Sequence, residues 1–212
     1  MNLIKPSFFI ESIPTDLELI ERAGRTCYKS EESITEDSSK KFISMILRKG
    51  HESVLEHLSM TVRFICDRGV THELVRHRLC AFSQESTRYC NYKGGVTFII
   101  PPWVPLEPGE YGIVNNLKGT TRRWFMAMIE AEEVYIGLIS LGWTPQQARS
   151  VLPNALKTEI VVTANMREWR HIFKLRTSKA AHPQMREIMV PLLASVKREV
   201  EGMFDDIKGD SE

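Results

Sequence analysis

The segment "SMTVRFICD", residues 59–67, alternates between apolar side chains and a more polar set. A repeat of two residues is typical of a β-strand that buries one face and exposes the other. We therefore predict a strand over 59–67 whose buried face carries Met60, Val62, Phe64 and Cys66.

Helical spacing of apolar residues occurs on both sides of this strand. Capping residues, apolar periodicity and stop signals predict helices over 14–24, 35–50, 71–78, 120–142, 166–177 and 182–207, with a further helix starting at Thr144 and Pro145. Pro191 should kink or split the last of these helices, because proline cannot donate a backbone hydrogen bond.

The remaining segments complete a mixed architecture. "KTEIVVTAN" (157–165) predicts a second strand, and "GGVTFIIPPW" (94–103) a short one that ends before its prolines. The polar segment 83–92 should be extended and half-exposed, and 103–116 a mobile surface loop. Because strands and helices mix without a regular βαβ order, we predict an α+β fold with a mostly antiparallel central sheet and long C-terminal helices.

Length and charge limit the class of protein. The chain has 212 residues, enough for one good core, and 28 basic against 27 acidic residues, a net charge of +1. Such a balance provides no overall field for gathering nucleic acid. No segment approaches the roughly 18 to 20 unbroken apolar residues of a membrane span, and the N-terminus lacks a signal peptide's basic region. We expect one cytoplasmic domain over 1–212, with no nucleic-acid and no membrane partner.

The stretch "THELVRHRLCAFSQESTRY" (71–89) concentrates fixed positive charge at Arg76, Arg78 and Arg88. On the predicted helix, Arg76 and Arg78 point about 200° apart, so they would hold different groups, or a ligand and a neighbouring subunit. Arginine suits phosphate or carboxylate, which its planar fork binds through paired hydrogen bonds. The alternative is that these arginines pair with carboxylates on a solvated face.

The same segment resembles a family signature. "RHRLCAFSQES" (76–86) reads R-H-R, seven residues, then Ser86, and is similar to the signature of the flavin-dependent thymidylate synthases. "GHESVLEH" (50–57), "ARSVLP" (148–153) and "NMREWRHIFKLR" (165–176) resemble other blocks of that family in the same order. The resemblance spans most of the chain.

The resemblance implies a function and an assembly. The family's enzymes convert dUMP to dTMP, with FAD as cofactor, 5,10-methylenetetrahydrofolate as carbon donor and NADPH as reductant. They form homotetramers with a central antiparallel sheet flanked by helices, and several chains build each active site. FAD and dUMP would then approach the arginines from different sides.

Site residues follow from motif positions. The resemblance implies that FAD contacts Ser53, Arg76, His77, Arg78, Gln84, Asn165, Met166, Arg167 and His171. It implies that dUMP contacts Glu73, Leu74, Val75, Arg76, Gln84, Glu85, Ser86, Thr87, Arg88, Arg149 and Arg176. His51 would lie on the nicotinamide or folate side. The chain departs from the family pattern at three of these positions. Some members have Gln in place of Glu73 and Glu in place of Gln84, and Asn is frequent in place of His171.

Arg176 is the implied catalytic residue. A permanent cation at the edge of uracil stabilises the anion that forms when N3 loses its proton, which makes C5 more nucleophilic. Reduced flavin supplies the hydride, so no protein nucleophile is needed.

Nucleophilic alternatives centre on Ser86 and Cys80. No histidine and acid are spaced to form a triad with Ser86, and no G-x-S-x-G elbow is present. Cys80 is expected to be a packed thiol rather than a nucleophile. The four cysteines form no C-x-x-C pair and are expected to be reduced.

Two other classes of protein remain possible. "HESVLEH" and "HELVRH" suggest a metallohydrolase, but their histidines are six and five residues apart, not the i, i+4 spacing of a helical zinc site, so no metal is predicted. A nucleic-acid module could use the arginines with Tyr89, Tyr92 and Trp103 as stacking groups, which the neutral charge disfavours.

Overall fold

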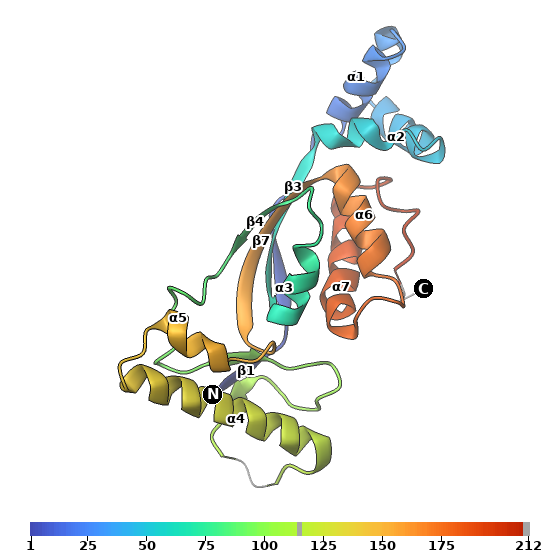
Figure 1. Cartoon of the computed structure of the whole chain (residues 1–212). Coiled ribbons are helices and arrows are strands. Elements are labelled where there is room, and N and C mark those ends of the chain that lie inside the picture. Colours follow the sequence, from blue (N-terminus) through green and yellow to red (C-terminus); the bar gives the residue numbers. More distant parts are fainter. Residues whose placement is uncertain (114–115, 210–212) are drawn as a thin grey trace. The chain divides into compact units, whose positions relative to one another are not determined.

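The computed structural model describes residues 1–113 and 116–209, and it has an α+β fold with mostly antiparallel sheets flanked by helices (Figure 1). The chain forms two compact units. Unit 1 comprises Met1–Ser7, Phe64–Arg76 and Ser83–Ile160, and unit 2 comprises Phe8–Arg63, His77–Phe82 and Val161–Glu212.

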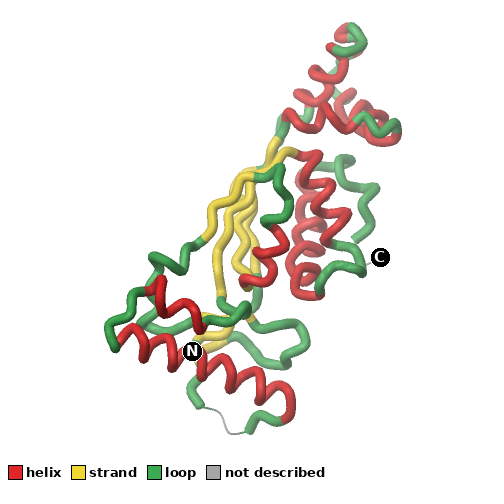
Figure 2. The backbone as a smooth tube through the Cα atoms, viewed as in Figure 1, coloured by secondary structure: helices red, strands yellow, loops and turns green. Residues whose placement is uncertain are grey.

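The predicted strands 59–67 and 157–165 are confirmed at both ends, as β3 (Ser59–Asp67) and β7 (Lys157–Asn165). They are neighbours in a four-stranded sheet ordered β2-β3-β7-β4, where β2 is Ser7–Ser12 and β4 is Ala81–Gln84 (Figure 2). All four side chains of the predicted buried face of β3 are fully buried. On the opposite face, the hydroxyls of Thr61 and Thr163 hydrogen-bond across the two strands at 2.9 Å.

Unit 1 is built on a second, three-stranded sheet. β1 (Asn2–Ile4) pairs in parallel with β5 (Thr97–Ile99) and antiparallel with β6 (Gly109–Glu110). Apolar side chains of these strands, among them Leu3 and Phe98, pack against Phe125 of α4 (Gly119–Ser140). Glu132 of α4 accepts a hydrogen bond from the backbone N–H of Val96 at 2.7 Å and pairs with the N-terminal amine at 2.8 Å. The helix is thereby tied to the sheet by a buried carboxylate with charged and neutral partners.

Three short helical elements of unit 1 position the candidate site. α5 (Pro145–Ala148) starts at Thr144 and Pro145 as predicted, and the 3₁₀ turn η3 (Arg149–Val151) follows directly. α4 lies beside α5 and η3 (Figure 1). α3 (Arg68–Leu74) begins where β3 ends, with the Asp67 carboxylate accepting from the N–H of Val70 at 3.0 Å as an N-cap.

Unit 2 is mainly helical. α1 (Glu18–Thr26) packs on α2 (Ser38–Arg48), and α6 (Met166–Arg176) packs on α7 (Pro183–Glu199) (Figure 1). The 3₁₀ turn η1 (Glu31–Ser33) lies between α1 and α2 in the chain, and the 3₁₀ turn η2 (Glu52–His57) lies between α2 and β3. η2 contacts both α1 and α6.

A buried arginine anchors the C-terminal segment of unit 2. Arg170 is 1% exposed, and its two terminal nitrogens each lie 2.7 Å from a carboxylate oxygen of Asp206. It also donates to the carbonyl of Met203 and, at 3.2 Å, to Glu52. Burial alone would lower the pKa of Arg170, but Asp206 and Glu52 raise it. Such a paired guanidinium is costly to break, because loss of either carboxylate leaves a charge in the core.

Several predicted boundaries are wrong. The helix predicted over 71–78 is α3, which starts earlier and ends at Leu74, so Arg76 and Arg78 follow the helix and their predicted 200° separation does not apply. Gly24 does not end α1; a Cβ there would overlap the ring of Phe42, so glycine permits the close packing on α2. α7 is not split at Pro191, and it ends at Glu199 rather than at residue 207.

The segment predicted as a loop, 103–116, is partly structured. Val104 and Leu106 are buried in the core of unit 1, and Gly109–Glu110 forms β6. Residues 114–115 lie outside the described part of the chain. Within the described ranges 1–113 and 116–209, no helix has both the length and the apolar character needed to cross a membrane.

Candidate functional site

The predicted site residues divide between the two units. Unit 1 holds most of those predicted for dUMP: Glu73, Leu74, Val75, Arg76, Gln84, Glu85, Ser86, Thr87, Arg88 and Arg149. Unit 2 holds most of those predicted for FAD, with the predicted catalytic arginine: Ser53, His77, Arg78, Asn165, Met166, Arg167, His171 and Arg176. The chain passes from one set to the other between Arg76 and His77, within the R-H-R block.

Unit 1 contains a cavity of about 460 Å³ with a positive lining. Arg68, Thr87 and Arg149 line it together with uncharged residues of α5 and of the segment after it, and none of its lining residues is acidic. Nη1 of Arg149 donates to the Thr87 hydroxyl at 3.2 Å, although the two residues are 62 positions apart. Two guanidinium groups without a lining carboxylate favour an anionic ligand.

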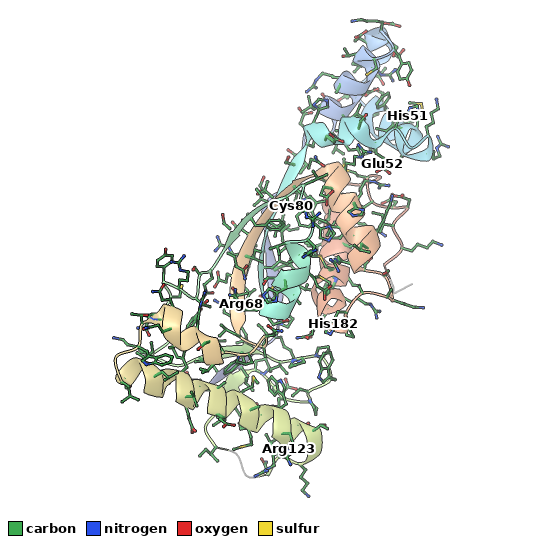
Figure 3. The ribbon with its side chains drawn as sticks, viewed as in Figure 1. His51, Glu52, Arg68, Cys80, Arg123 and His182 are labelled. Carbon is green, nitrogen blue, oxygen red and sulfur yellow. The ribbon has the colours of Figure 1, made fainter. Side chains whose placement is uncertain are left out.

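Arg68 strengthens this character. It is the first residue of α3, labelled in Figure 3, and its backbone N–H donates to the carbonyl of Asn154 at 2.9 Å. Its Nη1 is buried and has no hydrogen-bond partner among the residues that the structure describes. An unsatisfied buried donor costs free energy, and an anion in the cavity could satisfy it.

The turn after β4 arranges Ser86 and Arg88. The Ser86 hydroxyl oxygen accepts from the backbone N–H of Arg88 at 3.3 Å, and its carbonyl accepts from the N–H groups of Tyr89 and Cys90 at 3.1 and 3.0 Å. The Arg88 guanidinium is exposed and lies 5.5 Å from the centre of the Tyr89 ring. The turn thus leaves the Ser86 hydroxyl proton free to be donated and presents an exposed guanidinium two residues further along the chain.

Gln84 and Glu85 are held by neighbours within unit 1. The Gln84 amide donates to the hydroxyls of Thr71 and Thr158, at 3.0 and 3.3 Å. Glu85 accepts from the Tyr92 hydroxyl at 2.6 Å and from Lys157 at 3.1 Å. Burial and the Glu85 carboxylate raise the pKa of Tyr92, so its phenol stays protonated and donates. These contacts hold the start of the Ser86 turn in place.

Predicted residues at the end of α3 differ in access. The Leu74 side chain is 1% exposed and belongs to the core, whereas Val75 and Arg76 are exposed. Glu73 is half-buried. The side chains of Val75 and Arg76 are therefore the ones within reach of a ligand.

Unit 2 has a second cavity, of about 600 Å³, at the start of α6. Its lining includes three of the predicted flavin residues, Asn165, Arg167 and His171, and it also includes the basic Lys174 and the acidic Glu52, Glu56 and Glu168. Asn165 caps α6 by accepting from the Glu168 N–H at 2.9 Å, and Arg167 pairs with Glu56 at 2.6 Å. Ser53 is exposed on η2, between Glu52 and the buried Leu55 (Glu52 is labelled in Figure 3). Met166 is fully buried.

Three charged or polar side chains meet beside this cavity. Nε of Arg176 donates to Nε2 of His77 at 3.0 Å, and Nδ1 of the same ring lies 3.4 Å from Oε1 of Glu168. His77 is 5% exposed and Glu168 is 9% exposed. Burial, the positive charge of Arg176 and the nearby His171 lower the pKa of His77 to about 4. The imidazole is therefore neutral near pH 7.

The grouping of His77, Glu168 and His171 could suggest a metal, since one ligand atom from each lies within 4.8 Å of the others. The lone pair on Nε2 of His77, however, already accepts from Arg176, and the guanidinium beside it would repel a cation. The electrostatics of these side chains do not favour a metal ligand set.

Cys80, which is labelled in Figure 3, follows the R-H-R block and lies close enough to Glu168 to feel its charge. Burial and the Glu168 charge raise the pKa of its thiol to about 12. Because the thiolate is the reactive species, this environment suppresses nucleophilic chemistry at neutral pH. The four cysteines are free, as predicted.

Arg68 and Glu168 are site residues that sequence reasoning missed. Arg68 directly follows a predicted strand, where side chains often reach a sheet edge, but nothing in its neighbours marks it. Glu168 sits inside "NMREWRHIFKLR", between two basic residues of a predicted site. The sequence signal that could have identified Glu168 is that it is a carboxylate in an otherwise basic motif.

Comparison with known proteins identifies the family. The family described as "Thymidylate synthase complementing protein" matches residues 9–200. A flavin-dependent thymidylate synthase of Pyrococcus furiosus is 34% identical over 90% of this chain and 73% of its own length. One of Geobacter sulfurreducens is 32% identical over 93% of this chain and 84% of its own length.

Solved structures share the fold. The UMP/dUMP methylase PolB of Streptomyces cacaoi, bound with 5-Br dUMP, superposes with a TM-score of 0.81 over 97% of this chain and 96% of that one, at 24% identity. Thymidylate synthase X of Helicobacter pylori, with FAD and dUMP, gives a TM-score of 0.76 over 95% and 98%, at 23% identity. The resemblance noted in the sequence motifs is thus confirmed, and the chain belongs to the flavin-dependent thymidylate synthases, a family of methyltransferase enzymes.

Proposed function

We propose that this protein converts dUMP to dTMP with bound FAD, taking the carbon from 5,10-methylenetetrahydrofolate and the reducing equivalents from NADPH. The observation that carries the proposal is the cavity of unit 1, where Arg68 and Arg149 provide two positive charges without a lining carboxylate. A nucleotide monophosphate is an anion that such a cavity suits, and the relatives named above act on or bind one.

The phosphate of dUMP is assigned to the Ser86 turn and the positive cavity. Ser86 offers a hydroxyl donor, and Arg88 and Arg149 offer guanidinium forks. Thr87 lies between Ser86 and Arg88 in the sequence, and its side chain is buried. Its hydroxyl accepts the hydrogen bond from Arg149 and so holds the Arg149 side chain beside the turn. Gln84, Glu85 and the end of α3 complete the nucleotide set.

FAD is assigned to the start of α6 and the R-H-R block. The donor set of the second cavity fits a flavin dinucleotide: Arg167 and Lys174 are basic groups for a pyrophosphate, and Asn165 and His171 are further polar groups. Its carboxylates Glu52 and Glu56 already pair with basic side chains, and a bound anion would compete with these carboxylates for Arg167 and Lys174. When bound and reduced, the flavin supplies the hydride for the new methyl group.

Arg176 is assigned to the uracil ring. Its guanidinium stays charged at any physiological pH and would stabilise negative charge on the ring as N3 is deprotonated. Neutral His77 assists, because an imidazolium beside Arg176 would repel it. The high pKa of Cys80 supports a reaction without a protein nucleophile.

We further propose that the enzyme works in the cytoplasm as a homotetramer whose protomers share active sites, with residues 1–212 acting as one domain. The family match, which runs from residue 9 to 200 and so through both units, supports the last point. Analytical ultracentrifugation with activity assays across the dissociation range tests the assembly: a fully active monomer would contradict it.

The reaction is tested by tritium release from 5-tritiated dUMP. Release should require the protein with FAD, methylenetetrahydrofolate and NADPH, and dTMP should form in equal amount. Omission of FAD from the apoprotein should abolish both signals. Release that persists without flavin would refute the proposal.

A further inference from the structure

A buried carboxylate faces the side chain that holds the proposed catalytic arginine. Oε1 of Glu168 lies 3.4 Å from Nδ1 of His77, and Nε2 of the same ring accepts from Nε of Arg176 at 3.0 Å. All three residues belong to unit 2, with Glu168 in the first turn of α6 and Arg176 in its last. His77, which is not part of α6, thus contacts a residue at each end of this helix.

The chemistry of the groups settles which nitrogen of His77 carries the proton. A guanidinium can only donate, so Nε2 must present its lone pair to Arg176. A neutral imidazole then carries its single proton on Nδ1, which is the nitrogen that faces the Glu168 carboxylate. Glu168 therefore stabilises the one tautomer that can accept from Arg176.

We propose that Glu168 is a positioning residue, which through His77 holds the Arg176 guanidinium in the plane required at the substrate ring. The bond to His77 uses the nitrogen at the root of the guanidinium, so it sets the orientation of the whole planar group. Without the carboxylate, the proton could move from Nδ1 to Nε2 of His77. An N–H of the imidazole would then face the N–H of Arg176, and the hydrogen bond between the two side chains would be lost.

The surroundings of His77 are consistent with a maintained tautomer. Glu168, His171 and Arg176 face it from α6, and Cys80 lies near Glu168 on the segment that His77 begins. Burial lowers the pKa of His77 to about 4, with Arg176 and His171 adding to the shift, so a neutral ring is what the carboxylate must orient. The first turn of α6 is also where a carboxylate gains from the helix dipole, which lowers the cost of its burial.

The inference rests on the proposed function of Arg176, so its test has one readout that needs no turnover. In ¹⁵N-labelled protein, long-range ¹H–¹⁵N spectra of His77 should show an unprotonated Nε2, and the Arg176 Nε–H signal should be protected from solvent exchange. Glu168→Ala should shift His77 toward the other tautomer and remove that protection. Glu168→Gln keeps an acceptor oxygen and should preserve much of both.

Kinetics supply the second readout. Glu168→Ala should lower kcat about tenfold or more with less than about a threefold change in the KM for dUMP, as supporting groups commonly do, and Glu168→Gln should recover part of the loss. Glu201→Gln, an exposed carboxylate paired with Lys40 in the same unit, is the matched control and should leave both values unchanged.

The outcomes separate the two claims. An inactive wild type with the predicted His77 and Arg176 spectra would refute the proposed function but support the positioning contact. An active wild type whose Glu168→Ala variant is folded by circular dichroism and keeps its kcat and spectra would overturn the positioning role. A wild-type His77 protonated on Nε2 would overturn it as well.

Discussion

Arg149 and Thr87 are joined by a hydrogen bond of 3.2 Å across 62 positions of sequence. The bond connects the 3₁₀ turn after α5 with the turn after β4, and Arg149 lines the positive cavity of unit 1. The bond places the Arg149 guanidinium where the phosphate of the proposed nucleotide would lie.

Arg149→Ala should weaken dUMP binding about 10- to 100-fold, because one charge-assisted hydrogen bond contributes roughly 1.5 to 3 kcal/mol. Flavin content should stay near that of the wild type, since most of the predicted flavin residues lie in unit 2 and Arg149 is not among them. Isothermal titration with dUMP and the absorbance of bound FAD measure the two effects. Arg123→Ala, an exposed arginine of α4, serves as the control; equal losses of dUMP and FAD would contradict the assignment.

Arg176→Ala should reduce turnover more than affinity. A cation that stabilises charge developing on the ring acts in the transition state, and removing such a group typically costs about 100-fold in kcat. The KM for dUMP should change much less. Steady-state kinetics with varied dUMP check the split, with exposed Arg198→Ala as the control in the same unit. A pure KM effect would reduce Arg176 to a binding residue.

Cys80→Ser should remain active within about twofold. The pKa of about 12 leaves almost no thiolate at neutral pH, so the thiol has nothing to contribute as a nucleophile. Labelling with iodoacetamide at pH 7.5 should accordingly be slower at Cys80 than at the exposed Cys27, as mass spectrometry would show. An inactive Cys80→Ser variant that binds FAD and dUMP normally would restore covalent catalysis by Cys80 as a candidate mechanism.

His77 should make stability depend on pH. Its folded pKa of about 4 lies below the ordinary 6.5, so between these values the unfolded chain binds a proton that the native state does not. Stability is therefore fully present above about pH 6.5 and falls as the pH approaches 4, by up to about 3 kcal/mol.

The variant His77→Gln isolates this contribution. Glutamine keeps an acceptor near the position of Nε2 but does not titrate, so urea midpoints should fall less between pH 7 and pH 4 than in the wild type. His57→Gln, at an exposed histidine, should follow the wild-type curve. Parallel curves for wild type and His77→Gln would show that His77 is not buried in its neutral form.

Local patterns determined the elements that carry the site. The alternation over 59–67 and 157–165 predicts β3 and β7 with correct ends, because the side chains of a strand segregate with a period of two wherever one face is buried. The motif "NMREWRHIFKLR" predicts α6, and the structure adds that Asn165 is its cap. The block order alone indicated the family, which the comparisons confirm.

Tertiary structure decided where those elements stop and what their side chains meet. α3 ends at Leu74 with no glycine or proline to signal it, and this places His77 beside α6 rather than on a helix with Arg76. The partnerships of Arg149 with Thr87, and of His77 with Glu168 and Arg176, join positions 62 to 99 residues apart. Periodicity records only how a segment faces its own core, whereas a hydrogen bond between distant segments depends on how the whole chain folds, and no local pattern encodes it.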